Sequence, residues 1–197
     1  VAMPETVHYS ATIPVPSVGA YRRTVRLHKA EGKRLELHFE GVDSCLYLYV
    51  NGALAGFSQV SHSTSAFDIT DLVHDGDNTL EVHVLKWCFG SYLEDQDKFR
   101  MSGIFRDVYI LERAQARVED FAIRTSLAEH SAAISVSLTV NDHTADPRLS
   151  LYSPAGELLC VQKASESTEF LIDEPVLWTA ETPQLYTLLI QTADEVI

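Results

Sequence analysis

Hydrophobic and polar residues alternate with a period of two along most of this chain. Three runs in the first half show it, at residues 35–39, 46–50 and 80–84, and residues 134–140 repeat it in the second half. Successive side chains of a β-strand point to opposite faces of the sheet, so each run predicts a strand with one buried face and one wetter face. No stretch keeps apolar residues at helical spacing for three turns. The pattern therefore predicts an all-β protein.

Turn residues separate these runs. Asn51-Gly52 offers the two positive-φ positions of a type I′ hairpin between two predicted strands. Asp75-Gly76-Asp77-Asn78 also predicts a turn, because it lacks the twelve-residue spacing and the bidentate glutamate of a calcium loop.

A domain boundary is predicted at residues 113–117. A strand expected over 104–112 ends there, and a new strand is expected to begin at Asp120. The segment before the boundary has the length of a jelly-roll sandwich, and the segment after it has that of an immunoglobulin-like sandwich. We therefore expect two domains, 1–115 and 116–197, with the second domain one strand short at its C-terminal end.

Charge and composition narrow the range of partners. The 197 residues carry a formal net charge of −13, and 46 % of them are hydrophobic, as in an ordinary globular protein. An acidic surface opposes binding to nucleic acid and to anionic membranes. The eight histidines are scattered without a metal-ligand spacing. A neutral polar ligand such as a sugar fits this composition.

The compartment is predicted from cysteines and apolar runs. Cys45, Cys88 and Cys160 are odd in number and widely spaced, without a C-x-x-C pair, which predicts unpaired thiols rather than disulfides or zinc ligands. The first residues show no basic and apolar leader pattern, and no apolar run approaches the roughly 20 residues that span a bilayer. We expect a cytoplasmic protein that makes no membrane contact.

The segment 87–108 is the strongest functional signal. It lies between two predicted strands, 80–87 and 104–112, and it carries acidic residues, arginines and aromatic residues instead of the small turn residues of a plain connector. Acceptors, donors and ring faces at the rim of a rigid sheet are typical of a binding site. Trp87, Tyr92 and Phe99 could stack on the C–H face of a sugar, but Trp87 ends a predicted strand and is expected to pack in the core.

A family resemblance follows from this segment. The motif S-Y-L-E-D-Q-D-x-x-R-M-S-G-I-F-R-D-V at 91–108 resembles the N-terminal domain of the bacterial β-galactosidases of glycoside hydrolase family 2. Further pieces resembling the family occur in the same order along the chain, from about residue 13 to 190. They include Phe39-Glu40-Gly41-Val42-Asp43-Ser44, Val50-Asn51-Gly52, Phe67-Asp68-Ile69-Thr70, Gly76-Asp77-Asn78-Thr79-Leu80 and Leu177-Trp178-Thr179-Ala180-Glu181-Thr182-Pro183.

The resemblance implies a non-catalytic part of a larger enzyme. In the family, a (β/α)8 barrel supplies the glutamates that act as acid/base and nucleophile, and this chain does not contain that barrel. We expect no catalytic residue in the chain and no activity from it alone. The parent reaction implied is hydrolysis of terminal β-D-galactosides such as lactose with retention. The chain would support the barrel and lend the loop 93–101 to the galactose site of a homo-oligomeric enzyme.

The resemblance also suggests roles for residues of the loop. Asp97 matches the family aspartate that binds Na⁺ and contacts the galactosyl hydroxyls, and a carboxylate suits both tasks. The alternatives for Asp97 are a solvated surface aspartate and an internal ion pair with Arg100 or Arg106. Supporting roles are expected for Glu94, Asp95, Tyr92, Phe99 and Arg100. The cofactor implied for the intact enzyme is Na⁺, with Mg²⁺ as a further candidate, and neither is expected to bind tightly to this chain alone.

Three other interpretations remain open at this stage. The chain could be a stand-alone carbohydrate-binding module, since jelly rolls bind sugars with aromatic residues. It could be a scaffold or oligomer interface without a ligand. It could also belong to a sibling enzyme of the family, a β-glucuronidase or β-mannosidase, although the E-D-Q-D form of the loop favours a galactosidase.

Overall fold

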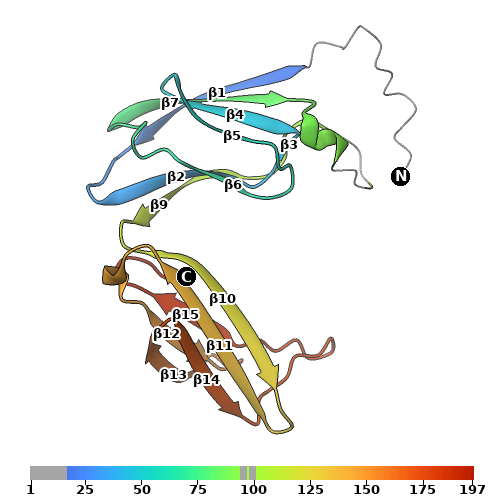
Figure 1. Ribbon diagram of the computed structural model, residues 1–197, viewed down its shortest axis with the longest axis vertical. Helices are drawn as coiled ribbons and strands as arrows, with labels where there is room; N and C mark the ends of the chain where they lie inside the picture. Colours follow the sequence, from blue (N-terminus) through green and yellow to red (C-terminus); the bar gives the residue numbers. More distant parts are fainter. Residues whose placement is uncertain (1–16, 94–96, 98–100) are drawn as a thin grey trace. The chain divides into compact units, whose positions relative to one another are not determined.

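The computed structural model describes residues 17–93, 97 and 101–197 (Figure 1). The chain forms two compact units, Val1–Glu112 and Arg113–Ile197. Regular structure in the described residues is β-strand, apart from two short 3-10 helices, η1 (Phe89–Tyr92) and η2 (His143–Ala145). The all-β class predicted from the alternating pattern is confirmed. None of the helices in the described ranges has the length and apolar character that a membrane crossing requires.

The first unit is built from antiparallel sheets. One sheet has the order β1-β7-β4-β5, a second has the order β6-β2-β9, and β3 pairs with β8 in a two-stranded ribbon. The bounds are β1 (Val18–Leu27), β2 (Lys33–Phe39), β3 (Val42–Asp43), β4 (Cys45–Val50), β5 (Ala53–Ser58), β6 (Ser65–Asp68), β7 (Gly76–Leu85), β8 (Gly103–Ile104) and β9 (Val108–Ala114).

The core of the first unit lies between its two larger sheets. Alternate residues of β2, β4 and β7 point inward, as the period-two pattern predicts. Phe39 and Phe67 meet edge to face in this core with ring centroids 6.0 Å apart. The buried members of the core are Leu35, Leu37, Phe39, Val42, Leu46, Leu48, Val50, Ile69, Val73, Leu80, Val82 and Val84.

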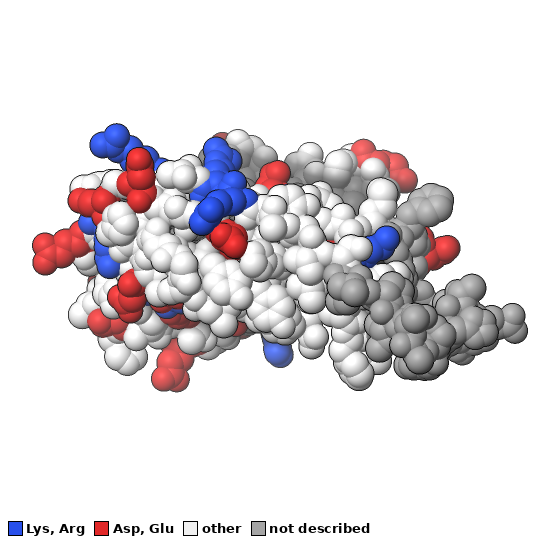
Figure 2. All heavy atoms as spheres, turned by 90° about the horizontal axis from the view of Figure 1, so that it is seen from above, with Lys and Arg blue, Asp and Glu red and all other residues white. Residues whose placement is uncertain are grey.

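The outer face of the sheet β1-β7-β4-β5 carries aromatic residues. The rings of Tyr47 and Phe57 lie 4.7 Å apart and are tilted by 40°, and those of Tyr49 and His83 lie 5.2 Å apart and are tilted by 49°. Figure 2 looks onto the first unit from this side and shows uncharged side chains across the middle of the face, with many of the charged ones toward one end. The two pairs lie one behind the other along β4, because Tyr47 and Tyr49 are two residues apart on one strand.

The second unit is a sandwich of two three-stranded sheets, β10-β11-β14 and β13-β12-β15. Phe170, Leu149 and Val136 are among the residues of its separate core. Val196 and Ile197 return along β15, where Ile197 and Ile190 exchange two backbone hydrogen bonds of 2.9 Å. The bounds are β10 (Val118–Leu127), β11 (Ser131–Val140), β12 (Arg148–Tyr152), β13 (Leu158–Lys163), β14 (Ser167–Asp173) and β15 (Thr187–Gln191).

Two predicted strands differ from the observed ones around the candidate loop. The strand predicted over 104–112 is two strands, β8 and β9, because the chain changes partner between them. Phe105 donates its backbone N–H to the carbonyl of Gly41, whereas the carbonyl of Asp107 accepts from the N–H of Glu40. The strand predicted over 80–87 ends at Leu85. Trp87 therefore lies outside the sheet and is 44 % exposed, so the prediction that it packs in the core is wrong.

Candidate functional site at one end of the first sandwich

The candidate loop begins with the tight turn η1. The hydroxyl of Ser91, which is buried, accepts a hydrogen bond from the backbone N–H of Cys88 at 3.1 Å, and the carbonyl of Cys88 accepts from the N–H of Ser91 at 3.1 Å. Leu93 then donates its N–H to the carbonyl of Gly90 at 2.9 Å. These reciprocal bonds satisfy the polar groups of the turn and fix the direction in which the chain leaves β7.

The loop returns to the sheet through β8. Gly103 has φ +123°, a backbone conformation that a residue with a side chain rarely adopts. Ile104 then pairs with Val42 of β3. Gly41 lies under the ring of Phe105, where a β-carbon would come within 2.7 Å of the ring. The two glycines thus provide the positive φ and the close approach that bring the loop back onto the sheet.

Arg106 links the returning strand to a neighbouring loop. Its guanidinium donates to the carbonyls of Glu40 at 3.5 Å and His62 at 3.4 Å, and it lies 5.4 Å from the centroid of the Phe105 ring. The ring of His62 lies 5.3 Å from that of Phe105. The sequence suggested Arg106 as an ion-pair partner for the loop carboxylates. Its described contacts are with backbone carbonyls and an aromatic ring.

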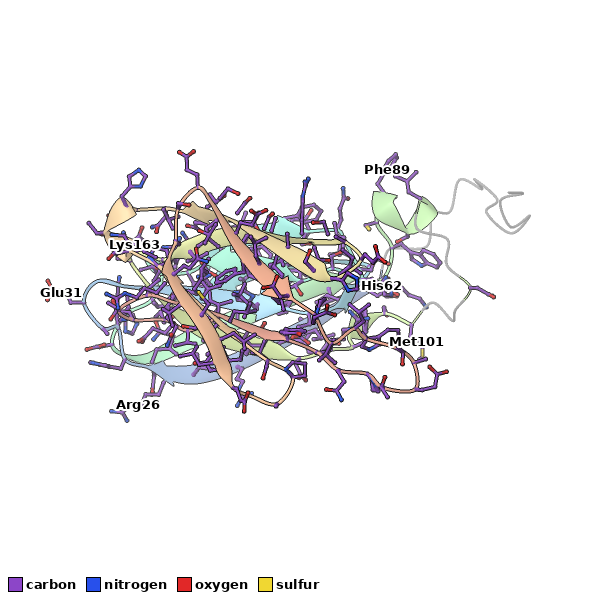
Figure 3. All side chains as sticks on the ribbon, turned by 90° about the horizontal axis from the view of Figure 1, so that it is seen from below. Arg26, Glu31, His62, Phe89, Met101 and Lys163 are labelled. Atoms are coloured by element: carbon purple, nitrogen blue, oxygen red, sulfur yellow. The ribbon has the colours of Figure 1, made fainter. Side chains whose placement is uncertain are left out.

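Large apolar side chains are exposed around this end of the sandwich. Figure 3 places His62, Phe89 and Met101 together at one end of the first unit, and Arg26 and Glu31 at the opposite end. We call the exposed apolar side chains at the end that holds Phe89 the apolar rim. It consists of Trp87, Phe89, Leu93, Met101 and Phe105, whose exposed fractions are 44, 74, 73, 74 and 45 %.

Most residues of the apolar rim were not predicted from the sequence to be exposed. The period-two pattern assigns apolar residues to a core, so it did not mark Phe89, Leu93, Met101 and Phe105 as exposed. Their position could have identified them, because these apolar residues occur within a segment that is otherwise polar. Exposed apolar residues that gather in one place are typical of a surface that contacts another body.

Asp97 is exposed at the same loop. Glu94, Asp95, Phe99 and Arg100 lie outside the described residues, as does the side chain of Tyr92, whose backbone closes η1. The expected supporting roles of these five residues, and the alternative ion pair between Asp97 and Arg100, therefore stay predictions. The described structure shows the two ends of the loop and one exposed carboxylate between them.

This end of the sandwich can offer one hard ligand to a cation. Asp97 supplies carboxylate oxygens, which suit Na⁺ or Mg²⁺. No group of three or more His, Cys, Asp or Glu residues within the described ranges is close enough to hold a metal ion.

Family models match both units of the chain. The model described as "Glycosyl hydrolases family 2, sugar binding domain" matches residues 1–114, and the one described as "Glycosyl hydrolases family 2" matches residues 116–197. The fold and the loop thus define a pair of β-sandwich modules, of which the first is of the sugar-binding type. The chain belongs to glycoside hydrolase family 2.

Relatives give the position of the chain within longer proteins. It is 48 % identical to a β-galactosidase of Actinobacillus pleuropneumoniae, over 91 % of this chain and 18 % of that protein. It is 47 % identical to a β-galactosidase of Staphylococcus xylosus, over 82 % of this chain and 16 % of that protein. The chain therefore spans less than a fifth of the length of these relatives.

Solved structures share the fold. A β-glucuronidase of Bacteroides uniformis superposes with a TM-score of 0.81 at 18 % identity, over 92 % of this chain and 26 % of that one. A β-glucuronidase of an uncultured Clostridium species has a TM-score of 0.80 at 20 % identity, over 93 % of this chain and 34 % of that one. At such low identity the likeness shows the fold alone, a jelly-roll sandwich followed by an immunoglobulin-like one.

Proposed function

We propose that this chain is the N-terminal, non-catalytic part of a β-galactosidase. The observation that carries the proposal is the 48 % identity to the Actinobacillus β-galactosidase, which extends over 91 % of this chain but only 18 % of that protein. The whole enzyme hydrolyses terminal β-D-galactosides such as lactose with retention, by means of two glutamates on a barrel outside this chain. It works in the cytoplasm as a homo-oligomer.

Asp97 is the residue through which the chain reaches the galactose site. Its carboxylate is exposed on the loop that lies between η1 and β8, at the end of the sandwich where the apolar rim is found. In the whole enzyme it would supply an oxygen to Na⁺ and accept hydrogen bonds from galactosyl hydroxyls. Bound Na⁺ would add a positive charge that orients sugar oxygens. Mg²⁺ is the second cation proposed for the enzyme, without a ligand assigned in this chain.

The apolar rim supports a second part of the proposal, contact with the catalytic barrel. Phe89, Leu93 and Met101 are each more than 70 % exposed in this chain. At about 25 cal/mol per Å² of apolar surface, burial of three such side chains would contribute several kcal/mol to docking. The same surface that holds the barrel would then place Asp97 at the edge of its active site.

The proposal can be tested in two steps. Calorimetric titration of this chain with galactose and lactose, with and without Na⁺, should show no heat of binding. A separate assay with a chromogenic β-galactoside should show no hydrolysis by this chain. In the whole enzyme, Asp97→Asn should lower kcat/KM for lactose at least about tenfold, because a charge-assisted hydrogen bond contributes about 1.5–3 kcal/mol. It should also weaken activation by Na⁺. The matched control is Asp71→Asn, an exposed aspartate next to Thr70, whose carbonyl accepts from Lys29 in the loop between β1 and β2. It should leave kcat/KM unchanged.

A stand-alone carbohydrate-binding module is the second candidate. The aromatic residues on the outer face of β1-β7-β4-β5 favour it. However, sugars stack on flat ring faces, and the two ring pairs of this face are tilted by 40° and 49°. Na⁺-independent binding of galactose to this chain, abolished by Phe57→Ala, would establish this candidate. Turnover by this chain would contradict both candidates.

A further inference from the structure

Two of the three cysteines lie near the junction between β7 and η1. Cys45 is the first residue of β4 and lies opposite Leu85, the last residue of β7. Cys88 follows three residues later and caps the N-terminus of η1. All three cysteines are free thiols, with Cys45 buried, Cys88 half-buried and Cys160 exposed.

Hydrogen bonds hold the start of β4 against the segment that leads from β7 to Cys88. Ser44 donates its backbone N–H to the carbonyl of Leu85 at 3.2 Å and its hydroxyl to the carbonyl of Lys86 at 2.9 Å. These bonds fix the start of β4 against the chain that leads to Cys88. The thiol of Cys88 is close enough to that of Cys45 to contribute to the raised pKa of Cys45, and it lies 3.6 Å from the hydroxyl of Ser91.

We propose that Cys45 and Cys88 form a dithiol site that low-molecular-weight disulfides such as glutathione disulfide oxidise to an intramolecular disulfide. The bond would join positions 43 residues apart in the sequence. It would fasten η1, which carries Phe89 of the apolar rim, to the first strand residue of β4. The inference is independent of the proposed function, because it depends only on the contacts of these two side chains.

The accessibility of the two thiols sets the order of the steps. Cys88 reacts first, because Cys45 is only 2 % exposed and because burial, reinforced by the nearby Cys88 thiol, raises the pKa of Cys45 to about 12. The Cys88 thiolate attacks one sulfur of glutathione disulfide and expels one glutathione thiolate. The Cys45 sulfur then attacks the Cys88 sulfur, and the second leaving thiolate takes the Cys45 proton. Two protein thiols are oxidised and one glutathione disulfide is reduced to two glutathione molecules.

Tryptic mapping tests the site directly. Trypsin separates the three cysteines into peptides 35–86, 87–98 and 149–163. The chain is incubated with glutathione disulfide, its remaining thiols are alkylated under denaturing conditions, and it is digested without reductant. We expect peptides 35–86 and 87–98 to be linked and to separate with dithiothreitol, whereas 149–163 carries a glutathione adduct. Recovery of 35–86 and 87–98 as separate alkylated or glutathione-bound peptides, beside an adduct on 149–163, overturns the proposal.

Two variants complete the test. Cys160→Ser should form the 35–86 to 87–98 link as the unsubstituted chain does, because Cys160 lies in the other unit. Cys88→Ser should abolish the link and leave Cys45 unmodified, since the buried thiol no longer has an exposed partner that captures the oxidant. Modification of Cys45 in Cys88→Ser, at the rate seen in the unsubstituted chain, would show that the two thiols react independently and would contradict the dithiol site.

Discussion

Arg113 and Glu195 form a two-pronged ion pair in the second unit. The Nε and one terminal nitrogen of Arg113 donate to the two carboxylate oxygens of Glu195, each at 3.0 Å, and the backbone N–H of Ala114 donates to the same carboxylate at 2.8 Å. Both side chains are largely buried, with 17 % and 13 % exposed. The pair ties the segment that opens the second unit to the hairpin that follows β15.

This pair predicts a pH dependence of stability. Burial acts to raise the pKa of Glu195, but the hydrogen bonds from Arg113 and Ala114 outweigh it and hold the pKa below its ordinary value of 4.5. A carboxyl whose pKa is lower in the folded state stabilises that state above pH 4.5 and loses this contribution as pH falls through the folded pKa.

We expect Glu195→Gln to lower the free energy of unfolding by about 2 kcal/mol at pH 7. Urea denaturation at pH 7 and at pH 3.5 measures the effect, and the gap between variant and unsubstituted chain should be smaller at the lower pH. Glu129→Gln is the control, because its side chain is 90 % exposed. It should change stability by less than about 0.5 kcal/mol at either pH. A gap for Glu195→Gln that is independent of pH would show that the pair does not set the pKa.

Asn78 predicts a second stability effect, in the first unit. It is fully buried, and its amide donates to the carbonyls of His74 at 2.7 Å and Gly76 at 3.0 Å. Its side-chain oxygen accepts from the N–H of His74 at 3.0 Å and from the amide of Asn51 at 2.8 Å. Asn78 thus satisfies the polar groups of the turn that enters β7.

We expect Asn78→Ala to cost roughly 2–4 kcal/mol in the free energy of unfolding, because it leaves several buried donors and acceptors without partners. Asn51→Ala should cost less, since Asn51 is exposed and water can replace its bonds. However, Asn51 has φ +50°, which adds a backbone penalty for alanine. Equal losses in urea denaturation of the two variants would contradict the role assigned to burial at Asn78.

The sequence predicted the parts of the fold that depend on local periodicity. The strands over 35–39, 46–50 and 80–84 lie where alternation placed them, and Asn51-Gly52 adopts the two positive φ values of +50° and +84° expected of its hairpin. The resemblance of 91–108 also predicted the family. The predictions for Trp87 and for the strand 104–112 were wrong. Both depend on which strands pair with one another, and the alternation of hydrophobic and polar residues does not contain that information.

The alternating pattern also could not predict that a residue on the polar face of a strand is buried. Alternation placed Glu36 on the polar side of β2, yet it is only 8 % exposed. Arg34 and His38 flank it on the same face at 2.8 and 3.2 Å, and Tyr109 of β9 stacks on His38 with ring centroids 5.1 Å apart. The strand that covers this face, β9, is distant in sequence from β2. The burial of Glu36 is therefore evident only from the fold.

Two glycines that approach aromatic rings should respond differently to the same substitution. A β-carbon at Gly56 would overlap the ring of Phe67, which packs against the core, whereas one at Gly41 would come within 2.7 Å of Phe105, which is 45 % exposed. Phe105 can swing into solvent, but Phe67 cannot move without disturbing Phe39. We expect Gly56→Ala to lower the free energy of unfolding by about 2 kcal/mol and Gly41→Ala by less than about 1 kcal/mol. The reverse order in urea denaturation would show that the returning loop is the more rigidly packed region.

The apolar rim gives a prediction that separates folding of this chain from contact with its parent enzyme. Phe89 and Leu171 are both 74 % exposed, the first on the rim and the second on β14. In this chain alone, Phe89→Ser and Leu171→Ser should each change the free energy of unfolding by less than about 0.5 kcal/mol, since neither side chain packs in a core.

In the whole enzyme, the two substitutions should diverge. Phe89→Ser removes apolar surface that the proposed docking buries, so the half-life of activity at elevated temperature should fall several-fold. Leu171→Ser should leave that half-life unchanged. If the two variants lose activity at the same rate, the rim does not hold the barrel, and the position of Asp97 must be set by other contacts. If Phe89→Ser alone is affected, the exposed residues around η1 act in assembly with the catalytic part.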